Sequence, residues 1–175
     1  MAVIITLTNE EILTSLNFIN NMREDKHEHN VKDKKFDSKN TSYSVNLMGH
    51  LGECAASRVY GGRVDTNVRT GGDAGYDLDI GGLTYQVKTS TTRDLIFNAP
   101  ELFSADRAIL VTLIGDRTQP HVNSKFIVWG HISRRKFMEV YQYRNYGYGD
   151  RLVCGLEYLI PVYQGENDVI CIPEV

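Results

Sequence analysis

The residues most suggestive of chemistry lie between Gly75 and Ser90, where the sequence reads GYDLDIGGLTYQVKTS. Apolar and polar residues alternate on both sides of a Gly-Gly pair, which predicts strands over 76–80 and 83–90 joined by a two-residue hairpin turn. The turn predicts Asp79 opposite Thr84 and Asp77 opposite Gln86. The polar face of this hairpin would then carry Asp77, Asp79, Thr84, Gln86, Lys88 and Ser90.

Carboxylate and amide oxygens on neighbouring strands are ligands of the kind that hold Mg²⁺ together with water and phosphate oxygens. Lys88, one pleat away, is placed to orient an attacking water and to offset charge on a phosphate. Metal-assisted phosphodiester hydrolysis uses these groups. A plain solvated face is equally open from the hairpin alone, since antiparallel hairpins commonly carry one. Aspartate is depleted in strands, so two strand aspartates favour the site.

The composition is that of an ordinary globular chain and limits the partners. A chain of 175 residues with 42% hydrophobic and 23% charged residues predicts one domain spanning 1–175. The net charge of −3 argues against coating nucleic acid by bulk charge, so any nucleic-acid site must be a local basic patch.

Cysteine usage and the N-terminal run predict a cytoplasmic protein without a membrane partner. Cys54, Cys154 and Cys171 show no CxxC spacing, which favours reduced thiols over a zinc site or a disulfide framework. The apolar run AVIITL is too short for a signal peptide or a membrane span.

Helices are expected on either side of a charged segment. Thr8 and Glu11 have the spacing of a capping box and predict a helix from about 9 to 22. Residues 23–42 mix charges densely and are expected to form an exposed arm or loop. An apolar stripe through Leu47, Leu51 and Ala55 then predicts a helix that stops at Gly61-Gly62.

The second half of the chain predicts a mixed sheet. The runs RAILVTLI and KFIVWG indicate buried strands, with Trp129 in the core, and Ser133 is placed to cap a helix. The tyrosine-rich run YQYRNYGYGDR fits either a packed loop or a surface that stacks on bases. The predicted fold class is α/β (α+β), a mixed central β-sheet flanked by helices.

The order Asp77, hairpin, Gln86-Val87-Lys88 resembles the core of the PD-(D/E)xK nuclease superfamily, including small phage and bacterial endonuclease-like proteins. The upstream segment GHLGE, ending at Glu53, is similar to the helix that precedes this core, and the resemblance covers roughly residues 45–140. It departs from the pattern at Tyr76, where the superfamily has proline, and at Gln86, where it usually has an acid.

The resemblance implies a restriction-endonuclease-like fold and a Mg²⁺- or Mn²⁺-dependent nuclease acting on DNA. The implied catalytic residues are Asp77, Gln86, Lys88 and Glu53, and the implied metal ligands are Asp77, Gln86, the Val87 carbonyl and Glu53. Asp79 would be an accessory ligand, and a turn role is favoured for Asp73. It also implies a phage, mobile-element or defence context.

Contacts with nucleic acid are expected at Arg69, Ser90, Arg93 and Arg144, whereas His50 and His131 are read as structural. The alternative function is a nucleic-acid-binding or assembly protein on the same fold without turnover, since Gln86 lacks the usual negative charge. A structural interaction module is the third class. The oligomeric state, including a homodimer, stays open.

Overall fold

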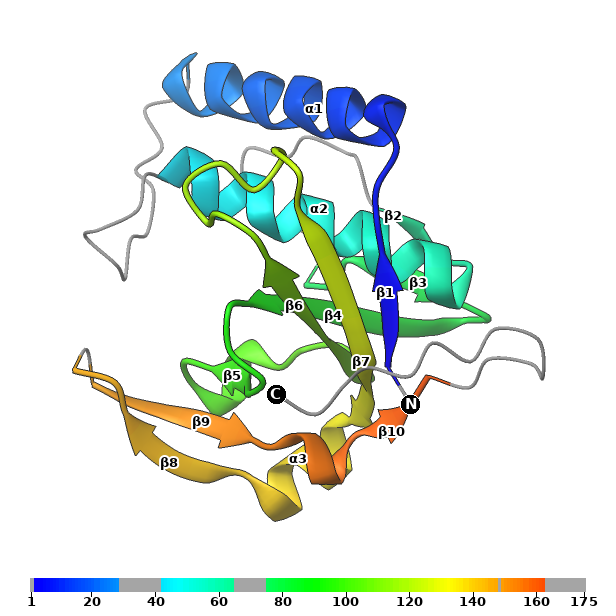
Figure 1. Cartoon of the computed structure of the whole chain (residues 1–175). Coiled ribbons are helices and arrows are strands. Elements are labelled where there is room, and N and C mark those ends of the chain that lie inside the picture. The colour runs from blue at the N-terminus through cyan, green and yellow to red at the C-terminus, as the bar shows by residue number, and fades with distance from the viewer. Residues whose placement is uncertain (1, 29–41, 65–74, 148, 163–175) are drawn as a thin grey trace.

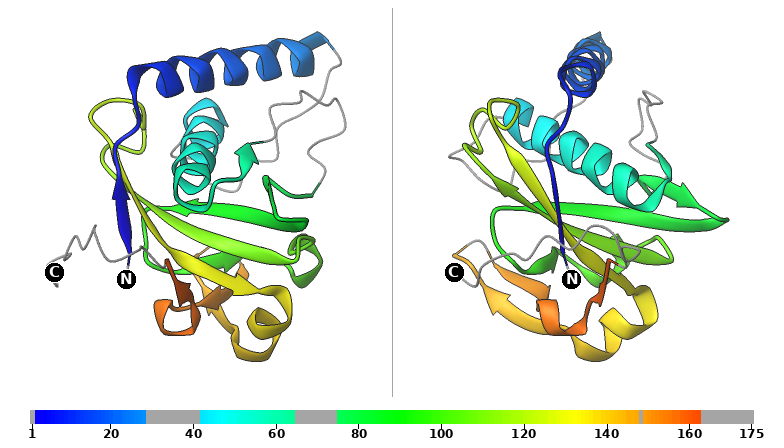
Figure 2. Two further views of the ribbon diagram at one scale, coloured as in Figure 1. Left: turned by 90° about the vertical axis from the view of Figure 1, so that its right-hand side faces the viewer. Right: turned by 45° about the vertical axis from the view of Figure 1, so that its right-hand side comes forward.

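The computed structural model describes residues 2–28, 42–64, 75–147 and 149–162, and these form stacked layers of helices and sheets (Figures 1 and 2). Helix α2 covers one face of a large sheet, and α1 lies over α2, farther from the sheet. A small sheet and α3 cover the opposite face. The described part of the chain is therefore a mixed α/β structure, as the sequence predicts.

The elements follow one another along the chain with these bounds: β1 Val3–Ile5, α1 Asn9–Glu28, α2 Ser42–Tyr60, β2 Arg63–Val64, β3 Leu78–Ile80, β4 Leu83–Ser90, β5 Leu95–Phe97, the 3-10 helix η1 Pro100–Leu102, β6 Arg107–Ile114, β7 Lys125–Ser133, α3 Arg134–Val140, β8 Gln142–Asn145, β9 Asp150–Cys154, the 3-10 helix η2 Leu156–Tyr158 and β10 Ile160–Pro161.

The large sheet has the strand order β1-β7-β6-β4-β3-β2, with β10 also pairing with β7. Its central pair, β4 and β6, is parallel, and its other pairs are antiparallel. The small sheet, β5-β9-β8, is antiparallel. A parallel pair between antiparallel neighbours makes the large sheet mixed, as predicted.

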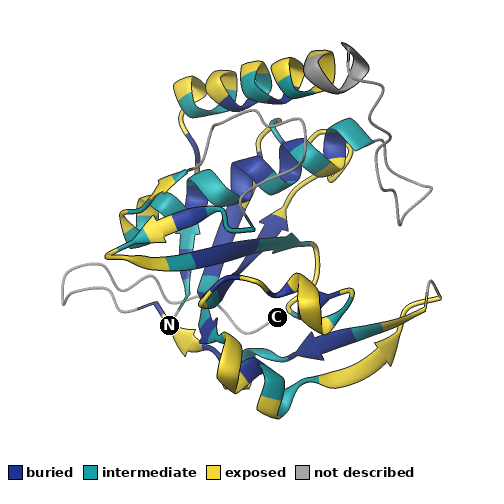
Figure 3. Ribbon diagram, turned by 180° about the vertical axis from the view of Figure 1, so that it is seen from behind, coloured by how far each residue is buried: buried dark blue, intermediate teal, exposed yellow. Residues whose placement is uncertain are grey.

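Two separate cores form because both faces of the large sheet are covered (Figure 3). The helix-side core packs α2 against the sheet and α1 against α2, and it includes Leu47, Leu51, Tyr85, Val87, Ile109 and Val111. The small-sheet-side core includes Leu95, Phe97, Phe103, Ala108, Leu110 and Phe137. Residues 108 and 110 thus face one core and 109 and 111 the other, which is why the run RAILVTLI is continuously apolar.

The first helix begins as predicted but ends later. Glu11 Oε2 accepts from Thr8 N at 2.6 Å, and Thr8 Oγ1 accepts from Glu11 N at 3.3 Å, which is the predicted capping box. Helix α1 continues to Glu28 instead of stopping near Met22. The expected arm at 23–42 therefore starts as helix, because Arg, Glu and Lys are good helix formers even without an apolar stripe. Residues 29–41 of that arm lie outside the described residues.

The hairpin has the predicted register near its turn. Leu78 pairs with Tyr85, Asp79 with Thr84 and Ile80 with Leu83. Gly81 and Gly82 have φ of 61° and 80°, the left-handed conformation that this two-residue turn requires. Strand β3 is shorter than predicted, since it starts at Leu78 instead of Tyr76.

The predicted strands and cap in the second half are confirmed, and two features differ from the prediction. Ser133 caps α3 by accepting from Lys136 N at 3.2 Å. The tyrosine-rich run forms the β8–β9 hairpin instead of a loop. Trp129 sits at an irregularity in the β6–β7 pairing and is only partly buried, with Nε1 donating to Thr112 Oγ1 at 2.8 Å.

Helix α2 approaches β4 closely at Gly52. A Cβ added there would lie 1.9 Å from Thr89 Oγ1, so only glycine fits without movement. Gly49, three residues earlier on the same helix, would place a Cβ with nothing within 4 Å in the part of the chain that the structure describes. The two glycines therefore have opposite relations to their surroundings.

We expect Gly52→Ala to lower the free energy of unfolding by about 1–3 kcal/mol, because Thr89 and its strand must shift. Gly49→Ala, the matched control, should raise it by roughly 0.5–1 kcal/mol, since alanine is the better helix former. Urea denaturation of both variants measures the difference. Equal stabilities for the two variants would contradict the close approach of α2 to β4.

His50 is a buried polar contact between α1 and α2. His50 is 3% exposed, and its ring packs against Phe18 in a tilted arrangement with centroids 4.5 Å apart. Ser15 Oγ donates to Glu11 O, so it accepts from His50 Nδ1 at 3.0 Å, and the Nδ1–H tautomer follows. Burial lowers the pKa of His50 to about 4. The sequence-based reading of His50 as a structural group agrees with this position.

The lowered pKa predicts acid sensitivity with a definite sign. A histidine whose pKa is lower folded than unfolded stabilises the fold above about pH 6.5, and this stabilisation is lost as the pH falls towards 4. The loss should reach up to about 3 kcal/mol relative to His50→Gln, which does not titrate. Denaturant unfolding at pH 7.5, 5.5 and 4 measures it. Parallel pH profiles for the two proteins would show that His50 is not the acid-sensitive group.

Candidate active site

Asp77 lies at a bend where the regular β3–β4 ladder ends. Its N–H donates to Tyr85 O at 2.8 Å, and its Oδ2 accepts from Val87 N at 2.6 Å. In a continued ladder Val87 N would bond a backbone carbonyl, so the Asp77 carboxylate takes the place of that carbonyl. The prediction that Asp77 pairs directly with Gln86 in the ladder is therefore wrong, yet Asp77 still reaches the Gln86-Val87-Lys88 segment.

Gln86 is buried and engaged on both ends of its amide. Its Nε2 donates to Leu102 O at 3.0 Å, and its Oε1 accepts from Ser104 N at 3.1 Å. With 8% of its surface exposed, Gln86 lies under the η1 segment and not on an open polar face. The expectation of a solvated face fails at this residue because residues 100–104 cover it.

Lys88 shares the face of Gln86 on β4, opposite α2. Its Nζ lies 5.0 Å from the centroid of the Phe97 ring, on the side of the small-sheet-side core. Lys88 and Thr89 are both partly exposed, so this end of β4 remains accessible to solvent. The ammonium is thus held beside β4 without being enclosed.

Glu53 lies on the helix that covers the other face of β4. It follows Gly52, the residue that packs against Thr89, and it is partly exposed. Its carboxylate also helps to raise the pKa of the Cys54 thiol, after the larger effect of burial. Asp79, expected from the sequence as an accessory ligand, is exposed and accepts from Gly82 N at 3.2 Å, a turn-stabilising contact, so we do not include it in the proposed metal site.

Thr84 and Asp106 form a clamp that the sequence analysis did not single out. Thr84 N and Oγ1 both donate to Asp106 Oδ2 at 2.9 Å, and Asp106 N donates to Thr84 Oγ1 at 3.1 Å. These bonds lower the pKa of Asp106, with the Thr84 backbone bond as the largest cause. The only sequence signal is an aspartate immediately before a buried strand.

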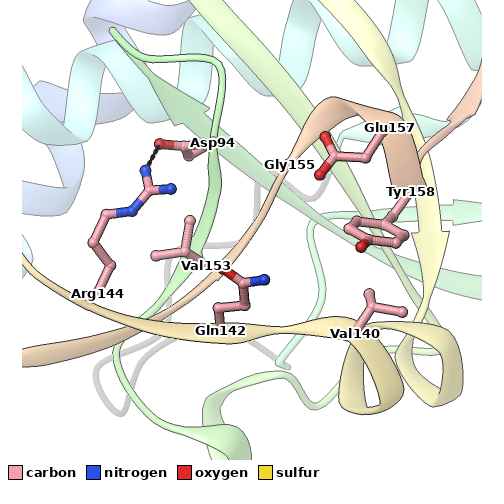
Figure 4. A pocket seen from close by; sticks show the side chains of 8 residues that line it. All are labelled: Asp94, Val140, Gln142, Arg144, Val153, Gly155, Glu157 and Tyr158. Atoms are coloured by element: carbon pink, nitrogen blue, oxygen red, sulfur yellow. Dashed lines mark hydrogen bonds and ion pairs between the residues drawn. The ribbon is translucent and has the colours of Figure 1, made fainter.

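The expected nucleic-acid contacts lie at different places. Ser90 Oγ accepts from Thr92 N at 3.0 Å, and the Arg93 guanidinium lies 5.3 Å from the Trp129 ring centroid. Arg144 pairs with Asp94 at 2.7 Å on the rim of a mostly polar pocket of about 170 Å³ (Figure 4). Arg69 and Asp73 lie outside the described residues.

The residues near β4 fit a divalent cation in part. The Asp77 carboxylate and the Val87 carbonyl lie at the same edge of β4. The carboxylate accepts from Val87 N, and the N–H and C=O of one strand residue point the same way. These two groups are oxygen donors of the kind that Mg²⁺ or Mn²⁺ takes, whereas the predicted ligand Glu53 lies on α2, over the face of β4 opposite to Gln86 and Lys88, so the predicted convergence of these residues on one face is not observed. Gln86 fits less well because its oxygen already accepts from Ser104 N. No group of three or more His, Cys, Asp or Glu side chains is arranged as a metal site within the described ranges.

Comparisons of this chain with protein families, with curated proteins and with solved structures find no match. Among the residues that the structure describes, no helix combines the length and apolar character needed to cross a membrane.

The environment of Gln86 predicts the effect of restoring an acid there. Gln86→Glu removes the donor to Leu102 O and sets a carboxylate against that carbonyl, so the free energy of unfolding at pH 8 should fall by about 1–3 kcal/mol. The new carboxyl group would have a raised pKa, so the deficit should shrink as the pH falls. Denaturant unfolding of wild type and variant at pH 8 and pH 5 measures this. A variant as stable as wild type at pH 8 would argue against the Leu102 hydrogen bond.

Proposed function

We propose that the chain is a Mg²⁺-dependent nuclease that hydrolyses phosphodiester bonds in DNA. The observation that carries the proposal is the 2.6 Å contact between the Asp77 carboxylate and Val87 N. It brings an acid from before the hairpin onto the Gln-x-Lys segment after it. The large sheet with α2 packed on β4 is compatible with a restriction-endonuclease-like fold, which forms part of the same proposal.

Each residue has a distinct role in the proposed reaction. Asp77 and the Val87 carbonyl would hold the cation at the edge of β4, and Glu53 would have to reach this edge from α2. A divalent cation held there would supply electrostatic stabilisation of the charge on the phosphate. Lys88 orients the attacking water and offsets the negative charge that develops on the phosphate. Gln86 holds the η1 segment against β4 and thereby positions its neighbours Val87 and Lys88.

The second candidate is a nucleic-acid-binding or assembly protein without turnover, and the position of Gln86 favours it. Its amide is committed to two backbone groups of residues 102–104, so it supplies neither charge nor a readily available ligand oxygen. A site with fewer charged ligands holds Mg²⁺ more weakly. Binding of nucleic acid without metal-dependent cleavage is the expected behaviour of this candidate.

For the nuclease, we expect Asp77→Asn to abolish Mg²⁺-dependent cleavage and Lys88→Met to lower it by about a hundredfold or more, the usual scale for a positioned catalytic group. Asparagine can still accept from Val87 N, and methionine keeps an unbranched chain over Phe97, so both folds should survive. Cleavage of plasmid and single-stranded DNA in Mg²⁺, Mn²⁺ or EDTA measures the effect.

Asp79→Asn is the matched control because it changes the same residue type two positions away, at a turn contact. It should retain wild-type cleavage. Wild-type activity in Asp77→Asn would remove the proposed metal site. Retained DNA binding with no cleavage by wild type in either metal would instead support the second candidate.

A further inference from the structure

A cluster of three aromatic side chains and an arginine lies on the helix-facing side of the large sheet, apart from the proposed catalytic residues. Tyr60 ends α2, Tyr85 lies on β4, Arg107 begins β6 and His131 lies on β7. The rings of Tyr60 and Tyr85 lie 5.7 and 6.0 Å from the ring of His131, and Arg107 lies 5.8 Å from the Tyr85 centroid. Tyr85 is buried, whereas the other three are partly exposed.

The hydrogen bonds of the cluster determine the tautomer of His131. Arginine has only donors, so the 2.8 Å contact between Arg107 Nη1 and His131 Nε2 requires Nε2 to accept. A neutral imidazole that accepts at Nε2 carries its proton on Nδ1. Nδ1 therefore donates to the Tyr60 hydroxyl oxygen at 3.3 Å. Burial, and then the Arg107 charge, lower the pKa of His131, in agreement with a neutral ring.

This arrangement leaves the cluster rich in donors and poor in acceptors. The Tyr60 hydroxyl accepts from His131, so its own hydrogen is left to donate outward. Arg107 uses one of its five N–H groups on His131. Among the described residues, Arg107 has no ion pair with a carboxylate. The nearest acid along the chain, Asp106, directs its carboxylate to Thr84, and the Arg107 charge is the last of the causes that shift the pKa of Asp106.

A partly buried guanidinium costs free energy unless an anion or hydrogen-bond acceptors compensate it. Planar guanidinium groups match phosphate oxygens with paired N–H donors, and a phenol hydroxyl adds a further donor. We propose that Arg107 and Tyr60, positioned by His131 and Tyr85, form a binding site for a tetrahedral oxyanion of the phosphate class. The site requires neither a metal ion nor any residue of the proposed catalytic set, so it does not depend on the proposed hydrolysis.

The occupant is either a free phosphate group or a phosphodiester of nucleic acid. Arg107 pairs with Tyr85, and Tyr85 O accepts from Asp77 N, so the cluster lies across β4 from the candidate active site. A nucleic-acid strand bound at Asp77 could therefore place a second phosphate here. Two arms of one experiment separate the sources.

In the first arm, inorganic phosphate is titrated into the full chain in EDTA at constant ionic strength, with ¹⁵N signals of His131 and the melting temperature as readouts. Phosphate should raise the pKa of His131, because an adjacent anion favours the imidazolium. Affinity should fall at least tenfold in Arg107→Gln, which keeps a donor for His131, and severalfold in Tyr60→Phe. Arg135→Gln, at an arginine already paired with Glu139, is the control and should bind phosphate as wild type does.

In the second arm, binding of a DNA oligonucleotide in EDTA is compared between wild type and Arg107→Gln. If Arg107→Gln binds the oligonucleotide more weakly than wild type and with a smaller salt dependence, the occupant is a backbone phosphate. If Arg107→Gln binds DNA as wild type does but has lost phosphate binding, the occupant is a free phosphate. The proposed site is wrong if phosphate causes no change at His131 in wild type. It is also wrong if wild type binds phosphate no more tightly than Tyr60→Phe and Arg107→Gln do. None of these readouts requires cleavage, so failure of the proposed nuclease activity is seen separately.

Discussion

The reciprocal hydrogen bonds between Thr84 and Asp106 set the register on which both proposed sites depend. They join the start of β4 to the residue before β6, and the parallel pairing then runs from Tyr85–Arg107 to Ser90–Thr112. Asp106 O also accepts from Arg134 N at 2.9 Å, which ties the first residue of α3 to the same point. Because side chains alternate between faces, a shift of one residue here would exchange the two cores. Arg107 would then leave Tyr85, and Lys88 would leave Phe97.

The elements that rest on local chemistry could be predicted from the sequence. The Gly-Gly turn with alternation on both sides predicts the hairpin, and the capping box predicts the start of α1. The bend at Asp77 could not be predicted, since it depends on a side chain replacing a backbone carbonyl. The cover over Gln86 also has no local signal, because its partners lie 16 and 18 residues farther along the chain. A polar residue in an alternating strand indicates a face but does not reveal what covers it.

Gln86 is the residue at which stability and catalysis make different demands. As an amide it can donate to Leu102 O and accept from Ser104 N at once, which a carboxylate cannot do. The same neutrality removes one negative charge from the proposed cation site. These two hydrogen bonds are enough to explain a glutamine at position 86, whichever of the two candidate functions holds. Its presence alone does not decide between turnover and binding, which is why metal-dependent cleavage is the informative measurement.

Charge pairing also determines where an acidic chain could meet a polyanion. With a net charge of −3, long-range attraction to nucleic acid is weak, so local cations must supply it. Several described cations are already compensated: Arg58 by Glu11, Arg144 by Asp94, and Arg135 and Lys136 by Glu139.

Arg107, in contrast, contacts a neutral imidazole and an aromatic ring, neither of which cancels its charge. Lys88 lies over Phe97 in a similar way. Arg107 lies on the helix side of the large sheet, across β4 from Asp77, and Lys88 lies on the opposite face of β4, so a phosphate backbone that reaches either cation approaches β4 from a different side.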